Sequence, residues 1–134
     1  MQYELLTLDA DRALLLRVIE TPSLERAQVL NTAMLADLSR LGFARLLVDC
    51  RELERSDFQA SDVRGLLHHL DRSIARHAAA GQTPDRLRIA LLSDADTFGH
   101  GIARMTVGHA YGLPHLQVHH ATDRDAALNW LRQA

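Results

Sequence analysis

Two short apolar runs constrain the fold of this chain more than any other feature of its sequence. Ala44 to Cys50 reads ARLLVDC, Leu87 to Leu92 reads LRIALL, and both are flanked by segments in which apolar residues recur at helical spacing. Short apolar runs that alternate with amphipathic helices are typical of strands buried in a parallel sheet. We therefore expect an α/β protein in which these runs are neighbouring central strands, with Leu47 and Val48 in the buried one.

The rest of the sequence supplies further elements around these two strands. Gln2 to Leu8 and Ala13 to Glu20 are predicted to form a strand hairpin, because both contain strand-forming residues and the connection is short. His115 to His119 alternates polar and apolar residues, as a half-buried strand does. Four helices are also predicted, and their expected starts are Thr21-Pro22, Ser61, Asp94 or Asp96, and a capping box at Thr122-Asp123-Arg124-Asp125.

The predicted order of elements is ββαβαβαβα, in one domain that covers residues 1–134. About five strands would form a mixed, mostly parallel sheet, and the four helices would cover it. A chain of 134 residues is long enough for one hydrophobic core. No internal repeat or low-complexity linker divides it.

The charge and composition of the chain exclude several functional classes. The formal net charge is -2, so we expect no nucleic acid as a partner. All 15 basic residues are arginines, and the absence of lysine excludes Schiff-base chemistry and a P-loop. No apolar run reaches the length of about 20 residues that a membrane span needs.

The single cysteine and the first residues of the chain indicate a compartment. A lone cysteine forms no intramolecular disulfide, which suits a reducing environment, and we expect Cys50 to be a small buried side chain. Met1 to Arg12 lacks a basic start followed by an apolar run, so we expect no signal peptide. The resulting expectation is a cytoplasmic protein.

Three segments of the sequence resemble a known family. They are RLLVDCREL at 45–53, RLRIALLSD at 86–94 and DRDAALNWL at 123–131. They resemble the SpoIIAA-like proteins, which are small bacterial domains with a STAS-type fold, and the resemblance covers almost the whole chain. It implies a STAS-type fold and a non-enzymatic regulatory or protein-binding role, of which anti-anti-sigma factors are an example.

The resemblance also implies candidate serines. In STAS-type anti-anti-sigma factors, a phosphorylatable serine begins the helix after the central strand, within an Asp-Ser-Ser-Gly-Leu sequence. This chain has Ser61-Asp62-Val63-Arg64-Gly65-Leu66 at that place and Ser56-Asp57 slightly earlier, and neither reproduces the motif. Ser56 fits the spacing from Asp49 better, whereas Ser61 better suits a helix start, where a cap is its alternative role.

The loop after the second central strand holds the other candidate binding residues. Open α/β sheets bind ligands beyond the carboxyl ends of their parallel strands. The candidates in and just after this loop are Ser93, Asp94, Asp96 and His100. Gly99 and Gly101 weaken the helix that follows, so we expect Ser93 to Met105 to be a mobile segment. We expect a ligand or partner to contact this segment, the Arg51 to Ser61 connection, or both. If the protein binds a small molecule, the glycines of this helix would be hinge points of a lid.

A hydrolase that uses Asp94 or Asp96 is a minor alternative. Asp94-Ala95-Asp96-Thr97 is similar to the nucleophile loop of haloacid-dehalogenase-type phosphatases. The phosphate-binding lysine of that family is absent, however, and the loop lies late in the chain. The sequence also has neither a G-x-S-x-G elbow nor a G-x-G-x-x-G dinucleotide motif. We therefore name no catalytic residue and expect no cofactor.

Histidines are unusually numerous, since the chain has eight and five of them lie between His100 and His120. A zinc site needs three or four side chains that converge on one point. His115 and His119 would lie about 13 Å apart along one strand, and His119 and His120 would point to opposite faces of it. We therefore expect no metal site.

Two functional hypotheses follow from these observations. The first is a non-enzymatic STAS-like module that binds a protein partner or associates with itself. The alternative draws on the wider similarity of the family to lipid carriers. It is a small-molecule or lipid-binding protein with an apolar cavity beneath the third helix, gated by the segment from Ser93 to Met105.

Overall fold

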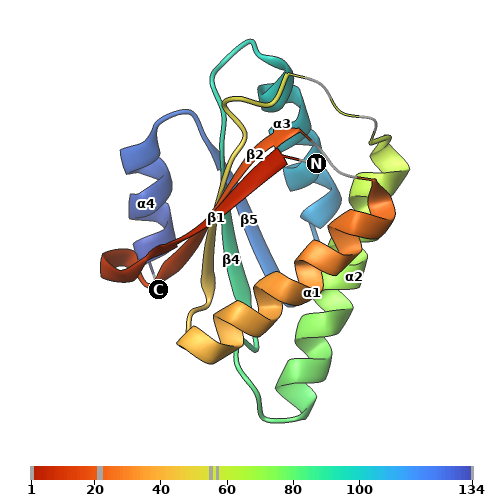
Figure 1. The fold of residues 1–134 in the computed structure, drawn as a ribbon, viewed down its shortest axis with the longest axis vertical. Helices are drawn as coiled ribbons and strands as arrows, with labels where there is room; N and C mark the ends of the chain where they lie inside the picture. Colours follow the sequence, from red (N-terminus) through yellow and green to blue (C-terminus); the bar gives the residue numbers. More distant parts are fainter. Residues whose placement is uncertain (1, 21–22, 55, 57, 134) are drawn as a thin grey trace.

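The computed structural model describes residues 2–20, 23–54, 56 and 58–133, and it confirms an α/β chain with a five-stranded mixed sheet and four α-helices (Figure 1). The strands are β1 (Gln2–Leu8), β2 (Ala13–Glu20), β3 (Arg45–Asp49), β4 (Leu87–Leu92) and β5 (Leu116–Ala121). The helices are α1 (Leu24–Leu41), α2 (Ala60–Ala79), α3 (Phe98–Ala110) and α4 (Arg124–Arg132). A 3-10 helix, η1 (Asp9–Asp11), forms the turn between the first two strands.

The strands lie side by side in the order in which they occur in the chain, β1-β2-β3-β4-β5. β1 pairs antiparallel with β2 because the turn at η1 reverses the chain, and the other three pairs are parallel. A helix joins each parallel pair, which provides the long connection that parallel strands need. β3 is therefore the central strand, and Leu47 at its middle is 0% exposed, which confirms its predicted core position.

The helices cover the two faces of the sheet unequally (Figure 1). α1, α2 and α3 pack on one face, which we call the three-helix face, and α4 alone packs on the other, which we call the α4 face. Side chains alternate along a strand, so Leu46 and Ile89 point toward the three helices, whereas Leu47 and Ala90 point toward α4. Leu131 of α4 is fully buried against this second face.

Local signals explain where α1 begins and ends. Ser23 is its N-cap, and the serine hydroxyl accepts a hydrogen bond from the backbone N–H of Arg26. The predicted start at Thr21-Pro22 lies outside the described residues. Gly42 ends the helix with a φ of 70°, in the left-handed region that glycine adopts without strain.

The predicted cap of α2 is wrong. Gln59 is the N-cap, because its side chain accepts from the backbone N–H of Asp62 while the Asp62 carboxylate accepts from the N–H of Gln59 at 2.9 Å. Ser61 instead lies within the first turn of the helix, and it is exposed.

The predicted caps of α3 and α4 are also wrong, each by one residue or more. Thr97 caps α3, rather than Asp94 or Asp96. Asp96 has a φ of 62°, so the chain makes a left-handed turn directly before the helix, and this turn leaves Thr97 in the cap position. Asp123, rather than Thr122, caps α4 through its carboxylate.

The last strand is shifted by one residue at its start and two at its end relative to the prediction. β5 begins at Leu116, and the backbone N–H of His115 donates to the buried carboxylate of Asp71 on α2 at 2.9 Å. The strand continues to Ala121 and therefore includes His120.

Candidate functional site

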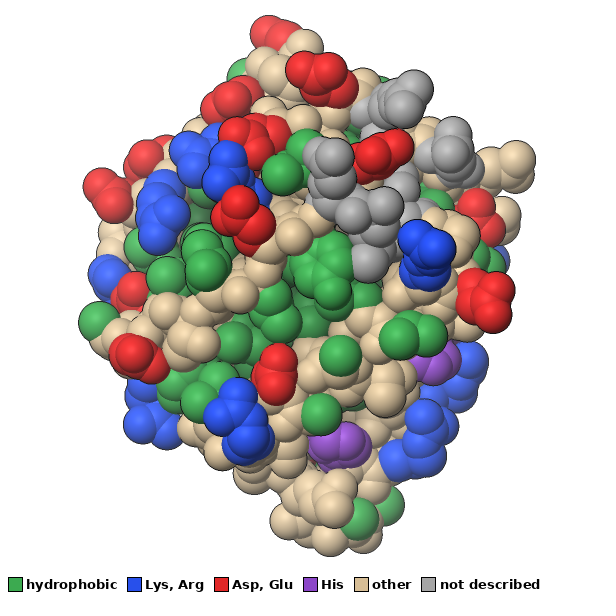
Figure 2. All heavy atoms as spheres, in the orientation of Figure 1, with side chains coloured by type: hydrophobic (Ala, Val, Ile, Leu, Met, Phe, Trp, Pro, Cys, Tyr) green, Lys and Arg blue, Asp and Glu red, His purple; other side chains and the backbone are tan. Residues whose placement is uncertain are grey.

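The three-helix face contains a cavity of about 180 Å³ at the carboxyl ends of β2, β3 and β4. It lies between the sheet and helices α1 and α2, and α3 forms one edge. Figure 2 shows hydrophobic side chains gathered in the middle of the surface between the N-terminal hairpin and these two helices. The lining residues are Tyr3, Leu16, Val18, Glu20, Ala27, Leu30, Asn31, Met34, Leu46, Val48, Cys50, Leu53, Phe58, Val63, Leu66, Leu67, Leu70, Ile89, Leu91, Ile102 and Thr106.

The wall of this cavity is almost entirely apolar. On the sheet, Val18, Val48 and Ile89 face the cavity because they lie on the same side of the pleat. Val48 is only half-buried for this reason, although the sequence predicted a buried position. The polar side chains of the wall are Tyr3, Glu20, Asn31 and Thr106. Such a wall gives an apolar molecule a favourable transfer from water and few hydrogen bonds.

Helix α3 contributes less to the cavity than the sequence predicted. Of the expected gate from Ser93 to Met105, only Ile102 is among the lining residues. Gly99 is a close-packing residue rather than a hinge, because a Cβ atom there would lie 2.2 Å from the backbone oxygen of Cys50. Gly101 has open space around it.

Cys50 lines the cavity as an inert apolar group. It is the single cysteine of the chain and it is buried, as predicted. Burial raises the pKa of its thiol to about 12, and the neighbouring charge of Asp49 adds to the effect. The thiol is therefore protonated at neutral pH and is a poor nucleophile.

Ser93 lies fully buried between two histidines at the end of β4. Its Oγ atom is 2.8 Å from Nε2 of His120 on β5 and 3.3 Å from Nδ1 of His100 in the first turn of α3. The centroids of the two imidazole rings are 4.6 Å apart, and the rings are inclined by 74°. The structure thus brings together two of the predicted site residues, Ser93 and His100, and adds a third.

His120 is the member of this group that the sequence analysis missed. It points to the three-helix face, as Val118 does two residues earlier, whereas His119 points to the α4 face and stacks on the indole ring of α4. Burial lowers the pKa of His120, and His100, His119 and Arg104 lower it further. The alternation of side chains along the strand was the signal that could have placed it beside α3.

The other predicted site residues do not join this group. Asp94 and Asp96 are exposed, and no side chain among the described residues hydrogen-bonds either carboxylate. Ser56 is half-buried, and its Oγ accepts a hydrogen bond from the backbone N–H of Phe58 at 3.0 Å. Ser61 is exposed on α2. Of the six predicted residues, only Ser93 and His100 contact each other through their side chains in the described part of the chain.

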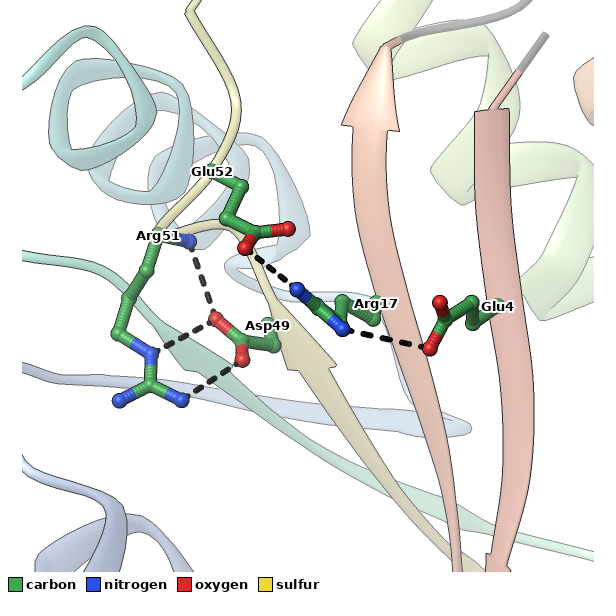
Figure 3. Close-up of polar contacts among 5 residues, drawn as sticks. All are labelled: Glu4, Arg17, Asp49, Arg51 and Glu52. Atoms are coloured by element: carbon green, nitrogen blue, oxygen red, sulfur yellow. Dashed lines mark hydrogen bonds and ion pairs between the residues drawn. The ribbon is translucent and has the colours of Figure 1, made fainter.

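A charged network occupies the α4 face at the same end of the sheet (Figure 3). Arg51 binds the carboxylate of Asp49 through Nε (3.0 Å) and Nη2 (2.9 Å), and its backbone N–H donates to the same carboxylate at 3.0 Å. Arg17 of β2 forms an ion pair with Glu52 and a second one with Glu4 of β1 at 3.3 Å.

This network holds the chain where it leaves β3. Asp49 is only 5% exposed, so its charge needs a partner. Burial opposes the charged form, but the hydrogen bonds from Arg51 outweigh burial and lower the pKa of Asp49. The hydrogen bond to Asp49 in turn raises the pKa of Arg51. The segment fixed in this way leads directly to Leu53, which lines the cavity.

In the described part of the chain, no three His, Cys, Asp or Glu side chains are arranged to hold a metal ion. None of the helices in the described ranges is long and apolar enough to cross a membrane.

Comparison with known protein families and with curated proteins finds no match for this chain. The apolar cavity and the buried serine with its two histidines are therefore the features from which a function can be argued.

Proposed function

We propose that this protein binds a small apolar molecule, or the apolar part of a larger one, in the cavity of the three-helix face. The observation that carries the proposal is an unfilled volume of about 180 Å³ with a nearly continuous apolar wall. Protein interiors are otherwise close-packed, and an unfilled volume deprives the side chains around it of dispersion contacts. A ligand of matching shape restores those contacts and removes its own apolar surface from water.

The volume of the cavity limits the size of the ligand. An engineered apolar cavity of about 150 Å³ takes up benzene or xenon. A volume of about 180 Å³ therefore suits one aromatic ring or a short branched alkyl group. Sites for drug-sized ligands are larger, on the order of 300–1,000 Å³. A longer ligand would leave its remainder outside, on the apolar surface seen in Figure 2.

The location of the cavity and the sequence resemblance support the same proposal. Open α/β sheets bind ligands beyond the carboxyl ends of their parallel strands, and the cavity lies at those ends of β2, β3 and β4. Membership in the SpoIIAA-like family with its STAS-type fold is part of the proposal. It connects the chain, through the similarity of that family to lipid carriers, to proteins that hold apolar ligands.

Calorimetric titration with toluene tests the proposal, because toluene is uncharged and of the right size. Val48→Phe places a ring in the cavity and should weaken toluene binding at least about tenfold, since the volume is then occupied. The matched control is Val29→Phe, which makes the same substitution at a position of α1 that is 67% exposed and does not line the cavity. It should leave the affinity within about twofold of the unchanged protein.

Two results would contradict the proposal. One is the absence of toluene binding by the unchanged protein at millimolar concentrations. The other is equal toluene binding by Val48→Phe and Val29→Phe, with thermal unfolding showing that both are folded. Native mass spectrometry of the purified protein complements the titration, because a retained molecule would identify the natural ligand.

A second candidate function is a regulatory, protein-binding or self-associating module of the anti-anti-sigma kind. The observation that favours it is the exposed hydroxyl of Ser61, which lies in a groove with Arg64 and His68 of α2 and His109 of α3. A phosphate on Ser61 would lie close to these bases. Intact mass spectrometry of protein purified from its natural cells tests this function. A phosphorylated form should appear and should be lost in Ser61→Ala, and its absence would count against the candidate.

A further inference from the structure

Three side chains connect the first turn of α3 to two neighbouring strands. His100 belongs to α3, His120 belongs to β5, and the hydroxyl of Ser93 at the end of β4 lies between them. The oxygen is 2.8 Å from Nε2 of His120 and 3.3 Å from Nδ1 of His100, and the serine is 0% exposed. We call this group the His–Ser–His cluster.

One hydroxyl hydrogen has to serve two imidazole rings in this cluster. When both histidines are neutral, the hydroxyl donates to one ring nitrogen and accepts from the N–H of the other. One added proton is tolerated, because the hydroxyl can turn toward the histidine that remains neutral. When both histidines are protonated, both ring nitrogens are donors and the hydroxyl hydrogen has no acceptor within the cluster. Two cations also face each other then, with ring centroids 4.6 Å apart.

The surroundings of the cluster make a second proton still less favourable. The titratable and charged groups that act on His120 are His100 and Arg104 of α3 and His119 of β5, and all of them are bases. Burial is the largest cause that lowers the pKa of His120, and these groups add to it. Within the described ranges, no carboxylate hydrogen-bonds either histidine of the cluster, so none offsets the added charge there.

The helix that this cluster holds also forms one edge of the cavity. Ile102 and Thr106 line the cavity and lie two and six residues beyond His100 in the same helix. Gly99 packs directly on the backbone oxygen of Cys50, a residue that lines the cavity as well. A displacement of the first turn of α3 would therefore open the cavity at this edge.

We infer that the His–Ser–His cluster is a proton-sensitive latch, which holds α3 at the edge of the cavity near neutral pH and releases it in acid. The release of α3 follows from the cluster alone, whereas the escape of a ligand rests on the function proposed above. The latch has the parts of a pH switch, namely titratable groups and an element whose position depends on them.

Amide hydrogen exchange at about pH 7 and about pH 5 tests the latch, because local opening of α3 exposes its amides. After correction for the intrinsic effect of pH on exchange, residues 99–106 should exchange at least about tenfold faster in acid. The central strand β3 should keep its protection. Faster exchange in residues 99–106 with unchanged exchange in β3 distinguishes local release of the helix from global unfolding.

Two substitutions test whether the His–Ser–His cluster causes the faster exchange of residues 99–106 in acid. His120→Gln keeps a side chain that hydrogen-bonds to Ser93 but cannot be charged, so exchange of residues 99–106 should become nearly independent of pH. His119→Gln is the matched control, because it makes the same change on the next residue, which points to the opposite face of β5. It should retain the acid-induced acceleration. If His120→Gln does not fold, His100→Gln makes the equivalent test from the other side of Ser93.

The latch is wrong if residues 99–106 are equally protected at both pH values, or if His120→Gln and His119→Gln accelerate alike in acid. Toluene titration at the same two pH values separates the latch from the proposed function. Acid-induced exchange together with weaker toluene binding in acid supports both. Acid-induced exchange without toluene binding at either pH supports the latch and overturns the proposed function.

Discussion

The two faces of the sheet are built from the same strands, yet they differ at the carboxyl ends of β2 and β3. Val18 and Val48 point to the three-helix face and line a cavity. Arg17 and Asp49, each next to one of these valines, point to the α4 face and form ion pairs. The alternation of side chains along a strand thus separates an unfilled apolar volume from a region where charges hold the chain in place. The cavity proposed for binding and the ion pairs that fix the chain therefore lie on opposite faces of the same two strands.

The largest expected effect comes from breaking the packing of the α4 face. Leu47→Ala removes a side chain that is 0% exposed, so it should lower the free energy of unfolding by about 2–5 kcal/mol. Val48→Ala, on the adjacent residue, enlarges a volume that is already unfilled, and it should cost only about 1 kcal/mol. Chemical denaturation measures both values. Equal losses for the two variants would show that the faces do not differ in packing as described.

A pair of glycines in α3 sharpens the comparison at the edge of the cavity. Gly99→Ala should destabilise the protein by about 1–3 kcal/mol, because the new Cβ would overlap the backbone oxygen of Cys50. Gly101→Ala meets open space and should instead stabilise the helix by up to about 1 kcal/mol. Thermal unfolding of the two variants and the unchanged protein measures both changes in stability. Stabilisation by both substitutions would show that a Cβ atom at Gly99 meets no close contact with Cys50, so that close packing would not explain this glycine.

The charged network on the α4 face should give a smaller effect. Asp49→Asn leaves Arg51 without its buried partner and should cost about 1–2 kcal/mol, since Arg51 is partly exposed and solvent screens its charge. Glu4→Gln, at the exposed end of the same network, should cause no measurable loss. Denaturant unfolding at neutral pH compares the two. A loss for Glu4→Gln as large as that for Asp49→Asn would mean that the network acts as one unit.

The pH dependence of stability tests whether the charge of Asp49 causes the loss expected for Asp49→Asn. Its folded pKa is lowered, so its stabilising contribution is complete above the unfolded value of about 4 and is lost as the pH falls through the lower folded value. The difference in stability between the unchanged protein and Asp49→Asn should therefore be constant at neutral pH and shrink below about pH 4. A difference that persists in stronger acid would assign the effect to packing rather than to charge.

Much of the fold could be predicted because its signals are local. The apolar runs around Leu47 and Ile89 identify β3 and β4, and the short connection between the first two strands identifies the hairpin. Helix caps were predicted less well because several polar residues stand near each helix start. Thr97 became a cap through the left-handed turn at Asp96, and Gln59 became one through its reciprocal hydrogen bonds with Asp62; spacing alone specifies neither.

The site was harder to predict because it depends on distances between elements. Val48 and Ile89 look like ordinary core residues in the sequence, and only the spacing of the helices over the sheet leaves a volume beside them. His100 and His120 are far apart along the chain. They meet because β5 lies next to β4 and because α3 covers that same face. Ser93 and His100 were predicted from their place in and just after the loop that follows β4, whereas His120 could be placed only with the register of β5.

Xenon binding to the crystalline protein tests the central claim most directly, because xenon enters apolar cavities without needing hydrogen bonds. The account predicts a xenon atom on the three-helix face, in contact with Val48 and Ile89, and no xenon atom beneath α4. In Val48→Phe the site should be lost, while Val29→Phe should keep it. No xenon beside Val48, or xenon only on the α4 face, would contradict the assignment of the binding cavity.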